Sequence, residues 1–416
     1  MAAHAFLSPS AAHRWLHCTA SPRIEKDLPD NAGTAAAEGT LAHAICEAYV
    51  LAAKSNFACG VPLDVDPEHA AIFFRERNAD FPHADDGGLP WESSPLYKPE
   101  MLEHAAAYAA EVMRVYGEVH AFCSDPELHV EVKTHLDEMI GMTGVCFGTI
   151  DCCIIADKEL HIIDFKYGKG VEVSAEQNPQ MMIYGCGALI EYQGIYNIEE
   201  AHLHIFQPRI GNYSSWSIAA KDLWHWGNTV LYEAARQALG KRGDHLEAGT
   251  WCKFCRAKAQ CKTLAKYCTD VSGECKGAEL MTVEELAALL PKMKVIREWT
   301  DAVEQHALDI ALAGEKVPGY KLVEGRSVRK VTDQVGLISR MLDEGIEEEN
   351  FYKPKELQTL TVLEKMIGKK RFAELSEGCV EKPAGKPTLA PESDKRKAID
   401  LFASSMSGED FSEFAE

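Results

Sequence analysis

The sequence predicts an α/β protein with helical additions at both ends. Apolar residues at helical spacing come before and after a group of short apolar strands between residues 128 and 168. A further helix and strand follow over 177–192 and 200–209, and this alternation is typical of α/β folds. With 416 residues, the chain is long enough for one large elaborated domain or for two domains.

The N-terminal part is predicted to be helical up to about residue 60. It begins with a plausible cap in LSPSAAHRWL, and a second helix places four apolar residues on one face: Ala37, Leu41, Ile45 and Ala48. Proline, glycine and aspartate clusters predict a loop-rich segment over 61–98. A helix is expected over about 100–120.

Strands dominate the next part of the chain. Apolar and β-branched residues predict strands in LHVEVKTHL, GVCFGTIDCCIIAD, ELHIIDFKYG and EAHLHIFQPR, with a helix in QNPQMMIYGCGALIEY. Asp157 and Lys158 are expected to form a hairpin turn between the second and third strands.

Three regions are predicted along the chain. Residues 1–275 hold the helices, strands and cysteine-rich segment, and 276–330 form an amphipathic helical extension. The extension is expected to be a helix pair broken at Pro291, because proline disrupts helix interiors. Residues 331–416 are expected to be mainly helical, with a flexible acidic tail.

Composition limits the possible surroundings and partners. No run of eighteen apolar residues occurs, and the N-terminus lacks a basic start followed by an apolar core, so we expect a cytoplasmic protein without a membrane partner. Fourteen cysteines in a reducing compartment favour metal binding or packing over disulfides. The net charge of −21 does not exclude nucleic acid, because a local groove with bound cations can attract phosphate.

Two aspartates interrupt the apolar strands. Asp164 and Lys166 are two apart and therefore point to the same face of their strand. Pairing through the 157–158 turn sets Asp151 opposite Asp164, with the side chains roughly 5 Å apart. Carboxylates that close repel each other unless a divalent cation lies between them. The alternative is that Lys166 simply neutralises an aspartate at a strand end.

Other residues add to this pattern along the chain. His43 lies on a predicted helix, and a neutral imidazole is a common ligand for divalent ions. Glu131 is a third acidic residue within an apolar strand. Gln180 and Tyr184 lie four apart on one helical face just after the strand that carries Lys166.

The order of these residues resembles the RecB-like branch of the PD-(D/E)XK nuclease superfamily over about residues 30–190. The resemblance implies a restriction-endonuclease-like core, in which helices flank a mixed central sheet. It also implies that Mg²⁺ or Mn²⁺ is bound by His43, Asp151, Asp164 and the backbone carbonyl of Phe165. By the same resemblance the catalytic residues are Asp151, Asp164 and Lys166, supported by Gln180, Tyr184 and Glu131.

The cysteines offer a second resemblance. Cys252, Cys255 and Cys261 have ligand spacing, and Cys18 precedes the strands. This arrangement is similar to the iron–sulfur staple of AddB-type nucleases and CRISPR-adaptation exonucleases, which implies that these four thiolates hold a [4Fe–4S] cluster. A Zn²⁺ site that combines the last three with Cys268 or Cys275 is the alternative.

These resemblances imply a metal-dependent DNA nuclease, expected to act as an exonuclease on single strands or duplex ends. The whole chain is also similar to phage and prophage proteins recorded as a domain of unknown function, which implies phage DNA recombination or processing, with other phage recombination proteins as partners. Basic residues interleaved with Trp251 and Phe254 over 241–270 agree with a DNA partner. The alternatives are a DNA-binding or assembly protein without turnover, and a zinc hydrolase, for which no His-Glu-x-x-His motif is found.

Overall fold

The structure is a computed structural model that describes residues 5–29, 33–79, 81, 88–240, 245–270, 280–323, 334–343, 368 and 371–372. The chain divides into two compact units, Met1–Val323 and Glu324–Glu416. The second unit contains helix α12 (Gln334–Asp343). The predicted acidic tail lies outside the described residues, and the predicted boundaries at 275 and 330 stay predictions.

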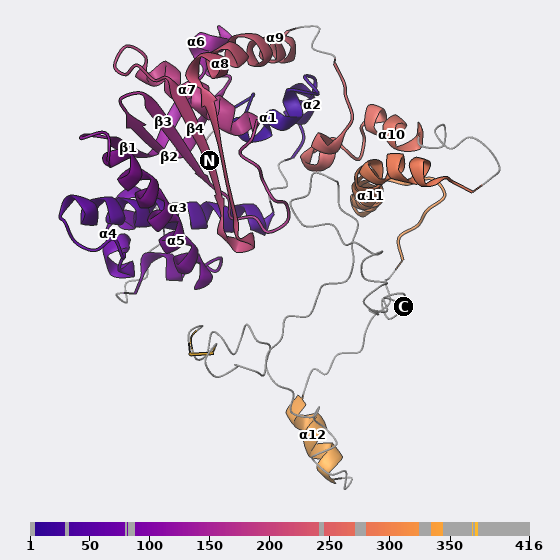
Figure 1. The fold of residues 1–416 in the computed structure, drawn as a ribbon. Helices are drawn as coiled ribbons and strands as arrows, with labels where there is room; N and C mark the ends of the chain where they lie inside the picture. The colour runs from indigo at the N-terminus through magenta and orange to yellow at the C-terminus, as the bar shows by residue number, and fades with distance from the viewer. Residues whose placement is uncertain are drawn as a thin grey trace, which may run out of the picture. The chain divides into compact units, whose positions relative to one another are not determined.

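A five-stranded mixed sheet forms the centre of the first unit (Figure 1). Its strands, in both chain order and spatial order, are β1 (Glu127–His135), β2 (Phe147–Ala156), β3 (Glu159–Phe165), β4 (Glu200–Gln207) and β5 (Asn212–Ala219). Strands β3 and β4 are parallel, and the other neighbours are antiparallel. A mixed α/β fold with helices around the sheet is therefore confirmed.

The hairpin between β2 and β3 has the predicted turn and register. Asp157 adopts a left-handed backbone with φ 45°, as tight two-residue turns require. Cys152 pairs with Ile163, so Asp151 and Asp164 occupy the next opposed positions at the end of the hairpin.

Helices cover both faces of the sheet (Figure 1). One face packs against α3 (Thr34–Ala58), α4 (Pro67–Arg77) and α5 (Glu100–His120). The other packs against α1 (Ala12–Trp15), α6 (Asp137–Ile140), α7 (Pro179–Tyr192), α8 (Ala220–Trp226) and α9 (Tyr232–Leu239). Helix α7 begins where the Asn178 side chain accepts hydrogen bonds from two backbone amides, with Pro179 at its first position.

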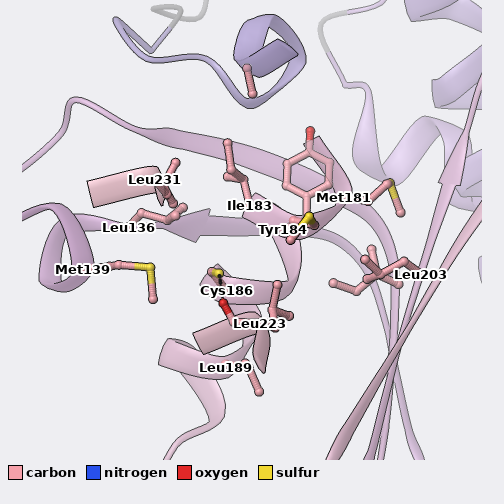
Figure 2. Close-up of a cluster of buried hydrophobic side chains, with 14 of the residues drawn as sticks. Leu136, Met139, Met181, Ile183, Tyr184, Cys186, Leu189, Leu203, Leu223 and Leu231 are labelled. Atoms are coloured by element: carbon pink, nitrogen blue, oxygen red, sulfur yellow. Dashed lines mark hydrogen bonds between the residues drawn. The ribbon is translucent and has the colours of Figure 1, made fainter. Parts of the chain in front are cut away.

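Each face of the sheet has its own apolar core. In Figure 2, Ile183 and Cys186 of α7 lie among Leu203 of β4 and Leu223 of α8. The opposite core is built on aromatic side chains that are almost fully buried, among them Trp91, Tyr108 and Phe165. Burial of each such side chain contributes roughly 1.5–3 kcal/mol, so this core holds the end of β3 that carries Phe165.

The first unit also contains several shorter elements. They are α2 (Ser21–Glu25), α10 (Lys262–Thr269), the 3₁₀ helices Pro9–Ala11, Pro90–Ser93, Pro208–Ile210 and Thr250–Phe254, and a π-helix over Gly227–Leu231. No helix in the described ranges combines the length and apolarity that crossing a membrane would require.

Three details differ from the sequence prediction. The segment 61–98 contains helix α4, which the Asp66 cap and Pro67 initiate. Strand β5 was not predicted, although its residues alternate in burial. Helix α11 (Val283–Leu312) runs unbroken through Pro291, so the expected helix pair is wrong. A capping box between Thr282 and Glu285 starts this helix, and strong helix formers on both sides of the proline maintain it.

The contact between α7 and β1 yields a stability prediction. A Cβ atom on Gly187 would overlap the side chain of Thr134, which is itself buried. We expect Gly187→Ala to lower the free energy of unfolding by about 1–3 kcal/mol, measured by urea denaturation. Gly117→Ala in α5 is the matched control: its Cβ meets open space, so we expect a gain of about 0.5–1 kcal/mol. Equal effects of the two substitutions would contradict this packing.

Candidate functional site

An open cleft of about 780 Å³ lies at the end of the β2–β3 hairpin. Its lining includes His43, Glu131, Asp151 and Lys166, together with the first turns of α3. The N-terminal end of a helix carries a partial positive charge that favours bound anions. The cleft therefore combines acidic ligands with a surface suited to an anionic group.

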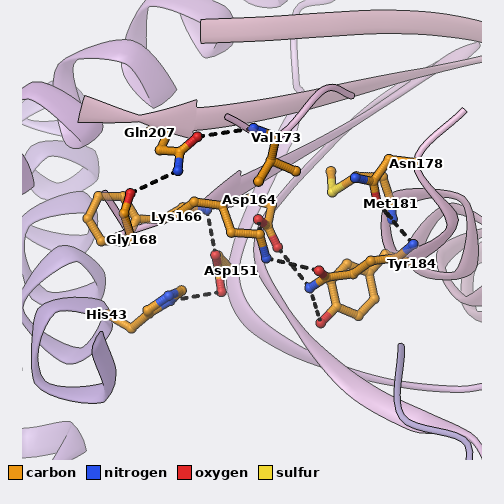
Figure 3. Close-up of polar contacts among 12 residues, drawn as sticks. His43, Asp151, Asp164, Lys166, Gly168, Val173, Asn178, Met181, Tyr184 and Gln207 are labelled. Atoms are coloured by element: carbon orange, nitrogen blue, oxygen red, sulfur yellow. Dashed lines mark hydrogen bonds and ion pairs between the residues drawn. The ribbon is translucent and has the colours of Figure 1, made fainter. Parts of the chain in front are cut away.

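Asp151 is held from two sides. One carboxylate oxygen accepts a hydrogen bond of 2.7 Å from the backbone N–H of Phe165 on the neighbouring strand. The other oxygen lies 3.3 Å from Nδ1 of His43 on helix α3. Strand pairing and helix α3 together fix this carboxylate, as Figure 3 shows.

A chain of polar contacts connects Asp164 to helix α7. Lys166 Nζ lies 2.9 Å from an Asp164 carboxylate oxygen and donates a 2.9 Å hydrogen bond to Gln180 Oε1. The Gln180 amide nitrogen donates to Asp164 and to the Tyr184 hydroxyl, each at 3.2 Å. The predicted glutamine–tyrosine pair thus lies beside the predicted aspartate and lysine.

Gly148 makes room for this arrangement. A Cβ atom at this position would lie 3.0 Å from both the Tyr184 ring and the Pro9 side chain. The glycine of Gly-x-x-Asp therefore serves the close approach of Tyr184 and of the N-terminal segment to strand β2.

The two aspartates differ electrostatically. Burial raises the pKa of Asp164, and although Lys166 opposes the shift, the negative charge of Asp151 adds to it. Burial would also raise the pKa of Asp151, but His43 and the Phe165 amide outweigh it and leave that pKa lowered. Burial opposes charge on His43, yet Asp151 raises the pKa of the imidazole. Such opposed shifts are typical of closely spaced carboxylates at functional sites.

Glu131 on strand β1 faces Asp151 and His43. Its neighbours Val130 and Val132 pair with Cys152 and Ile150, so Glu131 lies opposite Asp151. Its backbone is left-handed, with φ 54°, which is costly for a residue with a Cβ atom. Burial, together with the charge of Asp151, raises the pKa of Glu131 to about 8.

The arrangement can hold a divalent cation. One ligand atom each from His43, Glu131 and Asp151 lies within 4.8 Å of the others, which suits an oxygen- and nitrogen-ligated metal. Among the described residues this group does not include Asp164, whose carboxylate instead contacts Lys166 and Gln180. Phe165 contributes its amide to Asp151, and the predicted role of its carbonyl stays a prediction.

Two residues near the cleft were missed by sequence reasoning. Arg209 binds Glu38 at 3.2 Å and Glu100 at 2.9 Å, joining the start of α3 to α5. Gln207 donates hydrogen bonds to the carbonyls of Gly168 and Val171, and so holds the loop that follows Lys166. The only sequence signal for either residue is its position at the end of the predicted strand EAHLHIFQPR.

The four predicted cysteine ligands line one cavity. Cys18, Cys252, Cys255 and Cys261 surround a space of about 20 Å³ between the N-terminal segment and the segment around α10. Glu25 also joins the two segments: it accepts a 2.8 Å hydrogen bond from the backbone N–H of Arg256 and pairs at 2.8 Å with Arg14 of its own segment. Cys268 shares an apolar cluster with Cys252 and Cys261 but does not line the cavity, and Cys275 lies outside the described residues.

The four thiols have the right chemistry for a shared metal site. Four thiolates can hold a tetrahedral Zn²⁺ ion or an iron–sulfur cluster.

Comparisons with known proteins give a family and one structural likeness. The family described as "Protein of unknown function (DUF2800)" matches residues 4–397. A solved structure titled "Crystal structure of SSO0001" is 13% identical, with a TM-score of 0.22, over 47% of this chain and 81% of that chain.

The raised pKa of Glu131 predicts how the free energy of unfolding depends on pH when a chelator keeps the protein free of metal. Between pH 4.5 and about 8 the unfolded carboxyl ionises while the folded one stays protonated, so the wild type loses stability as pH rises. Glu131→Gln removes this loss. We expect the variant and the wild type to be similar near pH 5, and the variant to be more stable by up to a few kcal/mol at pH 8.

Thermal unfolding at both pH values, with and without Mn²⁺, measures this difference. Mn²⁺ should reduce the stability difference between variant and wild type at pH 8, because a cation stabilises the ionised carboxylate of Glu131. A stability difference that does not change with pH would contradict the raised pKa of Glu131.

Proposed function

The chain belongs to the DUF2800 family, and we propose that it is a Mg²⁺- or Mn²⁺-dependent deoxyribonuclease with a PD-(D/E)XK core. The main support is the juxtaposition of Asp151 and Asp164 at the end of one hairpin, with His43 and Lys166 beside them. Their motif order resembles that of RecB-like nucleases. An open cleft at this position leaves space for a phosphodiester.

Each residue of the site would have a separate role in the reaction. His43, Glu131 and Asp151 would hold the metal, because their ligand atoms lie within 4.8 Å of one another. Asp164, a ligand by the family resemblance, would join them from the facing strand. A bound divalent metal supplies a nucleophilic water at neutral pH and stabilises charge on the transferring phosphoryl group. Lys166 orients the attacking water or neutralises developing charge, and Gln180 fixes the ammonium group in position.

A neighbouring cleft offers a path for a DNA strand. This space of about 480 Å³ is lined by Trp251, Lys253, Phe254 and Lys294, and it shares Ser10 with the metal-ligand cleft. The Phe254 ring is 72% exposed, with Lys253 Nζ 5.3 Å from its centre. Exposed rings stack on bases, and lysines contact phosphates. Residues 241–244 of the predicted basic stretch lie outside the described residues.

The aromatic cleft and the family resemblance also support a more specific substrate and role. An exposed ring beside lysines favours unpaired bases, so we propose exonuclease action on single strands or duplex ends. The similarity to phage and prophage proteins supports a role in phage DNA recombination or processing.

A [4Fe–4S] cluster on Cys18, Cys252, Cys255 and Cys261 completes the proposal. Support comes from the cavity that the four cysteines share and from the resemblance to iron–sulfur nucleases. The cluster would be structural: it would join the N-terminal segment to the segment that carries Trp251 and Phe254.

Substitutions in the candidate active site test the proposed activity. We expect Asp164→Asn, Asp151→Asn and Lys166→Ala to reduce Mg²⁺- or Mn²⁺-dependent DNA cleavage roughly 100-fold or more, because each removes transition-state stabilisation. Cleavage of end-labelled single-stranded and duplex DNA measures this loss, and circular dichroism checks folding.

Lys158→Ala is the matched control, because Lys158 forms only an exposed ion pair with Glu199 at the other end of the hairpin. Full cleavage by a folded Asp164→Asn protein would refute the proposed site. Tight DNA binding by a wild-type protein that never cleaves would instead favour the alternative of a DNA-binding protein without turnover.

The cysteine cluster gives a separate prediction. Anaerobically purified wild type should be brown and contain about four irons per chain, whereas Cys18→Ser should lose iron and unfold at a lower temperature. A cross-link across so long a loop stabilises by about 4–5 kcal/mol on an entropic model. Cys268→Ser, at a cysteine that does not line the cavity, should change neither property. One zinc and no iron in the wild type would overturn the assignment.

A further inference from the structure

A second group of potential metal ligands lies at the opposite end of strand β3. Glu159 and His161 are two apart on β3, and Glu200 and His202 are two apart on β4. The parallel register pairs Glu159 with Glu200 and His161 with His202. Two Glu-x-His pairs are therefore aligned across neighbouring strands on the same face of the sheet.

The carboxylate of Glu159 lies between the two imidazoles. Its Oε2 atom is 3.4 Å from Nε2 of His161 and 3.8 Å from Nε2 of His202. Glu200 approaches His202 Nε2 at 3.8 Å from the other strand. The ligand atoms of Glu159, His161 and His202 all lie within 4.8 Å of one another.

The opposite nitrogen of each ring already has a partner. His161 Nδ1 lies 3.3 Å from Nε2 of His204, and His202 Nδ1 lies 2.7 Å from the Ser217 hydroxyl. Within the described residues, the buried Nε2 of His202 has no hydrogen-bond partner. Metal-binding histidines are usually held in this way, with one nitrogen fixed by a second group and the other facing the ion.

We propose that Glu159, His161 and His202, with Glu200 at the rim, form a second metal site, for a transition-metal dication such as Zn²⁺. Two imidazoles and a carboxylate are typical zinc ligands. Both imidazoles must be neutral to bind. Burial and the neighbouring histidines lower the pKa of His161 to about 3, so its ring is neutral at physiological pH.

Binding requires a small adjustment of the side chains. The ligand atoms of the three residues lie within 4.8 Å of one another, whereas ligands of a tetrahedral ion lie about 3.3 Å apart, so they must draw together. The His202 side chain is 20% exposed and therefore has room to move.

The location indicates a structural role for this ion. Glu159 and Asp164 are five residues apart on β3, which corresponds to about 16 Å along the strand. The ion would cross-link β3 to β4, the parallel pair whose other end carries Asp164. This site does not depend on the proposed nuclease activity.

Zinc binding by the full-length chain tests the proposal. We would dialyse wild type, Glu159→Gln, His161→Asn and His202→Asn against buffered Zn²⁺ and measure zinc per chain by mass spectrometry. Each variant should bind one zinc fewer than wild type, whatever zinc other sites take up. Ser217→Ala removes only the group that holds His202 and should weaken this binding about 10- to 100-fold.

His129→Asn is the matched control. His129 forms the same Glu-x-His pair with Glu127 on β1, but its strand partner is Cys153 rather than a histidine. This variant should keep the wild-type zinc content. The proposal would be overturned if folded Glu159→Gln and His202→Asn both bound as much zinc as wild type, or if His129→Asn lost the same equivalent.

Discussion

Repulsion between two carboxylates at the end of the β2–β3 hairpin governs the rest of this structure. The register that buries the strands also sets Asp151 opposite Asp164. Positive or hydrogen-bonding groups reach them from three elements: His43 from α3, the Phe165 amide and Lys166 from the end of β3, and Gln180 from α7. The helices on both faces of the sheet therefore help to hold one concentrated negative charge, and a divalent cation would complete its neutralisation.

Much of this arrangement could be predicted from the sequence because it depends on local rules. Alternation along β3 places Asp164 and Lys166 on one face, and a two-residue turn fixes the register that brings Asp151 across. The contacts of Gln180 and Tyr184 also follow from helical spacing, once α7 packs on the sheet.

The parts that could not be predicted depend on distant contacts or on competing local signals. The structural role of Arg209 depends on its contacts with Glu38 and Glu100, which lie more than one hundred residues earlier in the chain. Proline normally ends a helix, but the capping box and helix formers around Pro291 prevail. The left-handed backbone of Glu131 has no sequence signal, because glutamate rarely adopts it.

The buried pair of Glu25 with Arg14 and the Arg256 amide has a consequence for the order of biosynthesis. The partners of Glu25 include a residue 231 positions later. At roughly 5–20 residues per second, a ribosome needs about 10–50 s to deliver that partner. During this interval the N-terminal segment leaves the ribosome without the surface it finally covers. The cysteine cavity can therefore be completed only after all five strands have been synthesised, so an unfinished chain contains the aspartates before it contains the aromatic cleft.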